Sequence, residues 1–177
     1  MSKLISMLWN LIEAIALFFL RILCKIFHKE MTGGVQDAFL QFVRFGIVGA
    51  SSTFVNYGLY IVWLLTLRAL NLIASDDLEL LVANTGAWAM SVLWSFFWNN
   101  RYVFTMKEGE HRSWWRALLK SYCSYAFTGV FLSNVLLIVW TKGFGISEFI
   151  AHFINLMFSI PINFLMNKFW AYRTKKD

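Results

Sequence analysis

Four long stretches that contain no Asp, Glu, Lys or Arg constrain the fold of this chain more than any other feature. Each is about 20 residues long, which is the length of mainly apolar helix that crosses a hydrocarbon layer of roughly 30 Å. Strands of a membrane β-barrel would instead give alternating segments of about ten residues. We therefore predict an all-α polytopic membrane protein with four transmembrane helices, at about 45–67, 80–98, 121–141 and 149–167.

The composition fits neither a soluble globule nor a disordered chain. Apolar residues make up 59% of the 177 residues, against about 45–50% in soluble domains. Cys24 and Cys123 stand alone in the sequence, and two isolated cysteines form neither a disulfide framework nor a metal site. We expect no cofactor and no bound metal.

The positions of the basic residues predict the orientation in the membrane. Arg68 and Lys142 flank the two short turns, and the other fourteen of the sixteen Lys and Arg residues lie before the first span, between the second and third, or at and beyond the end of the fourth. Because cytoplasmic loops carry the excess of Lys and Arg, both termini are expected in the cytoplasm. The net charge of +6 favours contact with anionic membrane lipids. Nucleic acid is not an expected partner, since no basic domain stands apart from the spans.

The first segment, Lys3 to His28, is predicted to be an amphipathic helix that lies in the membrane interface. Its polar residues fall on one arc at helical spacing, and the remainder is apolar. A fifth span is the alternative, but it would leave Glu13 near the middle of the bilayer, which is costly. Glu30–Gly34 then forms a hinge. The expected organisation is an interfacial helix and hinge at 1–34, followed by a four-span domain at 35–177.

The second and fourth spans carry the same polar pattern at an offset of 68 positions. In each span the polar residues recur at steps of three or four and form one helix face. This match predicts two repeated helical hairpins, related by an axis along the membrane normal, as in some transporters. The aligned positions are Asn84, Ala87, Ser91, Ser95 and Asn99 in one span, and His152, Asn155, Ser159, Asn163 and Asn167 in the other.

Two other patterns have more than one interpretation. Gly46, Gly49, Thr53, Asn56 and Tyr60 form a stripe in the first span that favours close helix packing. The amide of Asn56 fits packing and a polar pathway equally well. The segment HRSWWRALLK (111–120) is typical of an anchor at the membrane interface, with contact to a substrate headgroup as the alternative.

The sequence offers no catalytic site. The four spans contain no carboxylate, and His152 has no Cys, Asp or Glu partner on its own face, so a hydrolytic triad or a metal site is not supported. Each of the two polar stripes ends, at the C-terminal end of its span, with Asn followed by a cation and aromatic residues. Arg101 and Lys168 there could hold a lipid phosphate, or the Asn residues could cap helices while the cations reach to the interface.

Three segments of the chain resemble the signature regions of the GtrA-like family: RFGIVGASSTFVNYGLY (44–60), NNRYVF (99–104) and PINFLMNKFWAY (161–172). The resemblance implies a small four-span protein of cell-surface polysaccharide synthesis that moves a polyprenyl-phosphate-linked sugar to the outer leaflet. Asn56 stands where many members have Asp. The residues at motif positions are Arg44, Asn99, Arg101, Asn163, Asn167, Lys168 and Trp170.

The resulting hypothesis is a flippase of the bacterial inner membrane for a polyprenyl-phosphate-linked monosaccharide, with no enzymatic activity. A homodimer or larger oligomer is expected, because four short spans enclose little space. The alternative is a scaffold that anchors a membrane glycosyltransferase without transporting anything. The candidate substrate-binding residues are Arg44, Asn56, Asn84, Asn99, Arg101, His152, Asn155, Asn163, Asn167, Lys168 and Trp170.

Overall fold

The computed structural model describes residues 3–28, 30–73 and 75–176, and it is helical almost throughout. The α-helices are α1 (Lys3–Ile26), α2 (Gly33–Ala69), α3 (Asp76–Trp98), α4 (Trp114–Ala126), α5 (Ser133–Ile138) and α6 (Glu148–Met166). Four π-helical segments continue or join them: η1 (Asn99–Val103), η2 (Phe127–Leu132), η3 (Val139–Gly143) and η4 (Asn167–Ala171). Two short strands, β1 (Glu110–His111) and β2 (Lys175–Lys176), pair antiparallel.

The prediction of an all-α chain with four membrane-spanning helices is confirmed. Four helical stretches in the described part of the chain are long and apolar enough to cross a membrane, and α1 is not one of them. They are Gly33–Ala69, Asp76–Val103, Trp114–Gly143 and Phe149–Ala171. These helices are longer than the charge-free intervals, because an interval without charge marks the hydrocarbon layer, whereas a helix continues into the polar interface.

The chain divides into two compact units, and the division falls inside α2 between Ile47 and Val48. In the first unit, the carboxylate of Glu13 on α1 forms an ion pair with the guanidinium of Arg44 on α2. The same guanidinium lies over the ring of Trp9, 5.6 Å from its centroid. Many apolar side chains of α1 are exposed, among them Phe18 and Phe19. This surface is what an interfacial helix would present to lipid, and the placement of α1 in the interface stays a prediction.

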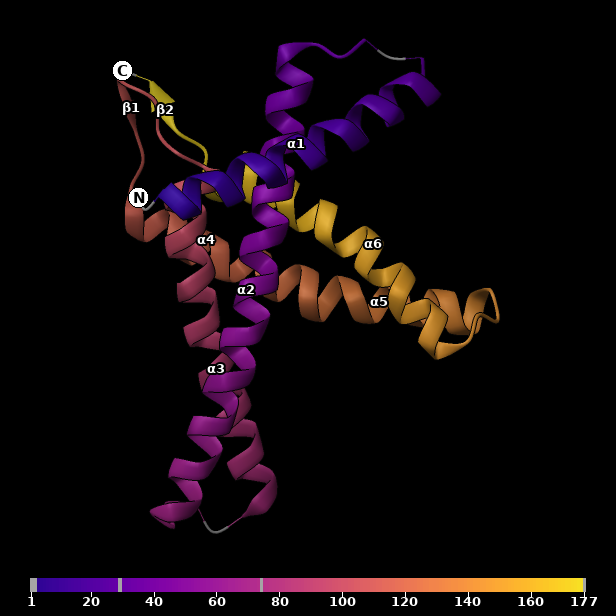
Figure 1. Ribbon diagram of the computed structural model, residues 1–177. Coiled ribbons are helices and arrows are strands. Elements are labelled where there is room, and N and C mark those ends of the chain that lie inside the picture. The colour runs from indigo at the N-terminus through magenta and orange to yellow at the C-terminus, as the bar shows by residue number, and fades with distance from the viewer. Residues whose placement is uncertain (1–2, 29, 74, 177) are drawn as a thin grey trace. The chain divides into compact units, whose positions relative to one another are not determined.

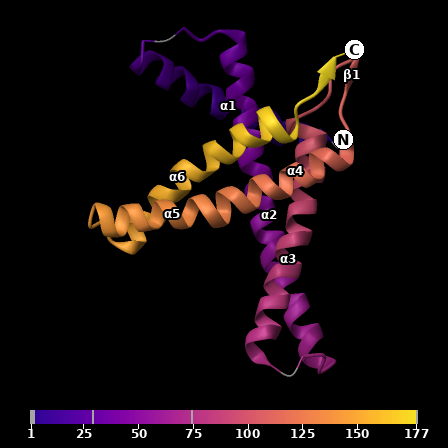
Figure 2. The ribbon, with the colours of Figure 1, turned by 180° about the vertical axis from the view of Figure 1, so that it is seen from behind.

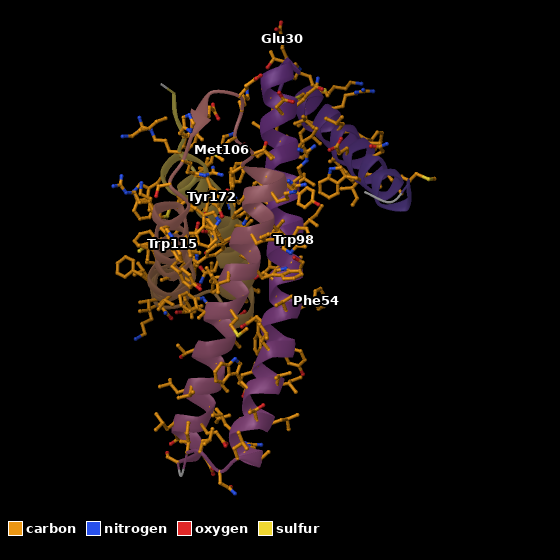
Figure 3. All side chains as sticks on the ribbon, turned by 90° about the vertical axis from the view of Figure 1, so that its left-hand side faces the viewer. Glu30, Phe54, Trp98, Met106, Trp115 and Tyr172 are labelled. Carbon is orange, nitrogen blue, oxygen red and sulfur yellow. The ribbon has the colours of Figure 1, made fainter. Side chains whose placement is uncertain are left out.

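The second unit contains two helical hairpins (Figures 1 and 2). In the first hairpin, α3 lies beside α2, and the Ser52 hydroxyl donates a hydrogen bond to the Ser91 carbonyl oxygen at 2.9 Å. Gly86 allows this approach, because a Cβ there would stand 3.0 Å from the indole ring of Trp63. Phe54, by contrast, points away from α2 and is 80% exposed, as a lipid-facing side chain would be (Figure 3).

The second hairpin is formed by α4, η2, α5 and η3 on one side and α6 on the other. The Asn155 amide donates a hydrogen bond to the Ser133 carbonyl oxygen at 2.8 Å and joins its two arms. The two hairpins are in turn joined where α3 meets α4. There the Tyr122 hydroxyl donates to the Ala89 carbonyl oxygen at 2.5 Å, and the Asn99 amide donates to the Tyr125 hydroxyl at 3.1 Å.

The far end of the first hairpin carries an ion pair between Arg68 and Glu79, at 3.0 Å. Glu79 is buried, so the charge of Arg68 is largely neutralised at this turn. In this unit, the strongly basic end is therefore the opposite one, which contains Asn99 and Asn167. The orientation of these ends relative to the membrane stays a prediction.

Candidate functional site

Two π-helical turns end the second and fourth transmembrane helices in the same way. In η1 the Phe104 amide donates to the Asn99 carbonyl oxygen at 2.8 Å, and in η4 the Tyr172 amide donates to the Asn167 carbonyl oxygen at 2.8 Å. The equivalent residues are 68 positions apart, as the repeat predicts. Single π-helical turns are rare in proteins and are frequent at functional sites.

The two asparagines do not terminate their helices, as the capping interpretation would require. Asn99 has φ −61° and ψ −42°, and Asn167 has φ −63° and ψ −48°, so both stay in the right-handed helical region. The residue that directly follows each π-helical segment, Phe104 after η1 and Tyr172 after η4, is buried. The motif therefore shapes the end of a helix by widening it, not by stopping it.

Four aromatic rings on either side of the two turns in the sequence form one continuous stack. Phe104 and Tyr172 lie at its centre, with ring centroids 4.5 Å apart and planes 22° apart. Phe96 stacks on Tyr172 at 5.7 Å, and Phe164 stacks on Phe104 at 6.0 Å. Phe96 and Phe164 are also 68 positions apart, so the repeat axis exchanges the two halves of the stack. All four rings are buried.

Asn99 and Asn167 lie against this stack and are both completely buried, with 0% exposure. The Asn167 amide donates to the backbone and side-chain oxygens of Asn163, both at 2.9 Å. The side-chain oxygens of Asn99 and Asn167 have no hydrogen-bond partner among the described residues, and neither does the buried hydroxyl of Ser124. A buried polar atom without a partner costs about 1–3 kcal/mol. Because Asn99 and Asn167 are fully buried, a ligand could reach their side-chain oxygens only if the packing around them opened.

Arg112 ties the two π-helical turns together. Its guanidinium donates to the side-chain oxygen of Asn100, to the Phe104 carbonyl oxygen at 3.0 Å and to the Tyr172 carbonyl oxygen at 2.9 Å. It also lies 5.0 Å from the centroid of the Tyr172 ring. Burial lowers the pKa of Arg112, while the charges of Tyr172 and Glu110 act in the opposite direction. The sequence pattern predicted only that Arg112 lies in an interface anchor, and nothing in it indicated these hydrogen bonds.

The two cations predicted to hold a phosphate have different surroundings. Arg101 is exposed, whereas Lys168 is half-buried, with its ammonium 5.5 Å from the Phe164 ring centroid. The repeat pairs Lys168 with Asn100, not with Arg101. Trp170 is engaged by another cation, since the Lys120 ammonium lies 5.5 Å from its ring centroid and donates to its carbonyl oxygen at 3.3 Å.

The other candidate residues lie elsewhere. Asn56 and Asn84 line a groove of about 600 Å³ between α2 and α3, together with Thr53, Tyr57, Tyr60, Asp77, Leu80 and Leu81. Asn155 is buried within the second hairpin. Arg44 belongs to the first unit, where Glu13 already neutralises it. His152 is part of α6, and its side chain lies outside the described residues. The structure thus brings one group of candidates together around η1 and η4 and a second group in the groove, whereas Arg44, His152 and Asn155 belong to neither group.

Comparison with known proteins identifies this arrangement. A family model described as the GtrA/DPMS transmembrane domain matches residues 44–175. The chain belongs to this family. The match includes both hairpins, the π-helical turns η1 and η4, and Arg112. Helix α1 and the first part of α2 precede the matched residues.

One relative has a described role. The chain is 27% identical over 100 residues to the cell wall teichoic acid glycosylation protein GtcA of Listeria innocua serovar 6a. The match covers 54% of this chain and 65% of that protein, slightly under two thirds of its length. A member of the GtrA/DPMS family with four apolar helices is a membrane protein. No group of three or more His, Cys, Asp or Glu in the described part of the chain could hold a metal ion.

Proposed function

We propose that this protein moves a polyprenyl-phosphate-linked monosaccharide from the cytoplasmic to the outer leaflet of a bacterial inner membrane, without a covalent step. The observation that carries the proposal is the pair of buried, unpartnered side-chain oxygens of Asn99 and Asn167 at one basic end of the spans. In this proposal that end and both termini are cytoplasmic. The family and the glycosylation role of the relative from Listeria innocua support a lipid-linked sugar as the cargo.

The chemistry of such a cargo matches the residues around the π-helical turns. Its phosphate would contact Arg101 and Lys168, which are the cations of the two repeated segments. Its sugar hydroxyls would donate to the free oxygens of Asn99 and Asn167 and stack on Trp170. The polyprenyl chain needs no site, because it stays in the hydrocarbon.

The remaining candidate residues would line the route between the leaflets. A polar headgroup that leaves water without compensating hydrogen bonds costs several kcal/mol for each group. The amides of Asn155 and Asn163 lie along the fourth span, to which His152 also belongs, and the groove with Asn56 and Asn84 lies along the first hairpin. Hydrogen bonds from these groups would lower that cost. Arg44, paired with Glu13, would orient α1 at the membrane surface.

The direct test is flux of a labelled polyprenyl-phosphate sugar in proteoliposomes that contain the purified full chain and no other protein. Flux above that of protein-free liposomes is expected. Correctly folded protein that leaves flux at the protein-free level would contradict the proposal.

A second candidate function is that of a scaffold for a membrane glycosyltransferase. The relative from Listeria innocua is described by its part in glycosylation, and a scaffold would take part in glycosylation without moving a lipid. The same proteoliposomes separate the two candidates. A scaffold gives no flux alone and increases glycosyl transfer only when the enzyme is added.

A further inference from the structure

A basic cleft of about 520 Å³ lies beside the π-helical turn η4, outside the residues assigned to the transport route. It is formed by the first turns of α4, by the chain around β1 and β2, which lie side by side (Figure 1), and by the end of η4. The lining residues are Met106, Glu110, His111, Arg112, Ser113, Arg116, Ala117, Lys120, Ala171, Arg173 and Lys175.

Positive charge dominates this cleft. Its lining contains five Lys and Arg side chains, namely Arg112, Arg116, Lys120, Arg173 and Lys175, and one carboxylate, that of Glu110. Glu110 accepts a hydrogen bond from the Lys107 amide at 3.0 Å, so its charge is partly stabilised by the backbone. A concave surface lined by charges of one sign concentrates the electrostatic field and attracts the opposite charge.

The cations divide into two kinds. Arg112 and Lys120 are fixed by backbone carbonyl oxygens of the π-helical turns. Arg116 and Arg173, in contrast, are exposed and stand on either side of the cleft, one on α4 and the other just beyond η4. A guanidinium presents parallel donors that match two oxygens of one phosphate. The cleft therefore has a fixed basic wall and two arginines that can close on an anion.

The apolar part of the lining is small. Ala117 and Ala171 are almost fully buried and form the floor, and Met106 is the only larger apolar side chain in the lining. Such a cleft fits a hydrophilic anion with a small attached group and has no surface for a hydrocarbon chain. Its position at the start of a transmembrane helix places it within reach of lipid headgroups, as basic pockets at membrane surfaces commonly are.

We propose that this cleft binds a phosphate-bearing ligand, either the headgroup of a membrane lipid or a soluble phosphate ester. Arg116 and Arg173 hold the phosphate oxygens from the two sides, and Arg112 and Lys120 supply the field behind them. The site is distinct from the predicted contact of Arg101 and Lys168, neither of which lines the cleft. The inference concerns binding alone, so it stands whether or not the bound molecule crosses the membrane.

Calorimetric titration of the purified full chain in a neutral detergent tests the proposal with two probes, short-chain phosphatidic acid and inorganic pyrophosphate. Saturable binding of at least one probe is expected. Binding of the lipid alone assigns the cleft to headgroups, binding of pyrophosphate alone assigns it to soluble esters, and similar binding of both shows that the phosphate is the recognised group. Absence of saturable binding by both probes overturns the proposal.

Variants connect the binding to the cleft. Arg116→Gln combined with Arg173→Gln should weaken binding of the responsive probe by about tenfold or more, because two charge-assisted contacts are lost. Arg116→Lys, which keeps the charge and loses the paired donors, should weaken it less. Lys142→Gln is the matched control, since Lys142 is exposed and does not line the cleft. Wild-type affinity in the double variant, or equal weakening by Lys142→Gln, overturns the proposal.

Discussion

The rings of Phe104 and Tyr172 stack with their centroids 4.5 Å apart, although the two residues are 68 positions apart in the sequence. Each ring follows a π-helical turn that begins at a buried asparagine. The contact therefore joins equivalent points of the two repeats at the axis that relates them. It fixes the two helix ends that hold the free oxygens of Asn99 and Asn167.

Loss of this contact should lower the stability of the joined end. Phe104→Ala removes a buried ring that stacks on two others, and a stacked aromatic pair contributes about 0.5–1.5 kcal/mol beyond its buried area. We expect a clear decrease in the thermal unfolding midpoint of the protein in detergent. Phe54→Ala is the control, because Phe54 is 80% exposed and should change the midpoint little. Equal effects of the two variants would contradict the assigned role of the stack.

The free oxygen of Asn167 gives the second prediction. Asn167→Leu keeps the approximate size of the side chain and removes a buried acceptor that has no partner among the described residues. The substitution also removes the two hydrogen bonds that the Asn167 amide donates to Asn163, so some loss of stability is expected and flux is compared per amount of folded protein. Flux of the lipid-linked sugar should fall by about tenfold or more, as expected for loss of a hydrogen bond to the cargo.

Asn134→Leu is the matched control for this variant. Asn134 also donates to the carbonyl oxygen four residues earlier in its own helix, but it is exposed. Its replacement should leave flux unchanged. If Asn167→Leu transports at the wild-type rate, the free oxygens are a feature of packing and not of transport.

Much of this architecture could be predicted from the sequence, because it depends on patterns among residues that are close together in the chain. The four spans follow from charge-free length, and the equivalence of Asn99 and Asn167 follows from helical spacing repeated at one offset. The contacts that join the repeats could not be predicted in this way. Arg112 binds the Tyr172 carbonyl oxygen across 60 positions, and no periodic pattern marks either residue.

The same limit explains the incomplete prediction for Arg44. The sequence placed Glu13 on the polar arc of an amphipathic helix and Arg44 in a family motif, but it gave no sign that the two form an ion pair. An ion pair between separate helices depends on their distance in space, whereas spacing along one helix reports only its own faces. For the same reason, the depth of each polar residue in the protein could not be predicted.

The orientation of the spans is the third prediction. A single cysteine at Asp76 or Ser147 should react from outside intact cells with a membrane-impermeant thiol reagent, and one at Gly109 or Thr174 should not. The background must have Cys24 and Cys123 replaced, because both are free thiols. Reaction at Gly109 from outside would overturn the orientation derived from the basic residues.

The ion pair of the first unit gives the fourth prediction. Glu13→Arg should separate α1 from the start of α2 by repulsion of Arg44, so that trypsin cleaves faster after Arg21 and Lys25 in α1. The exchange Glu13→Arg with Arg44→Glu should restore the slow cleavage of the wild type. Glu30→Arg, outside both helices, serves as the control for added charge. An exchanged pair that is cleaved as fast as the single variant would show that the pair does not hold α1.

The last prediction concerns Arg101 and Lys168 as contacts of the cargo phosphate. Lys168 acts there mainly as a point charge, so Lys168→Arg should retain much of the flux, and Lys168→Glu should abolish it by repulsion. Arg101→Gln combined with Lys168→Gln should reduce flux by at least about tenfold, since a hydrogen bond to a charged group contributes about 1.5–3 kcal/mol.

The alternative is that the two cations only reach to the membrane interface, as the exposure of Arg101 and the contact of Lys168 with the Phe164 ring also permit. In that case the double variant would insert less efficiently but transport normally once inserted. Flux in proteoliposomes must therefore be normalised to folded protein, and the titration of the basic cleft supplies a second readout. A double variant with wild-type flux and wild-type affinity at the cleft would leave Arg101 and Lys168 as interface anchors. Lost flux with unchanged affinity at the cleft would assign the two residues to the transport route itself.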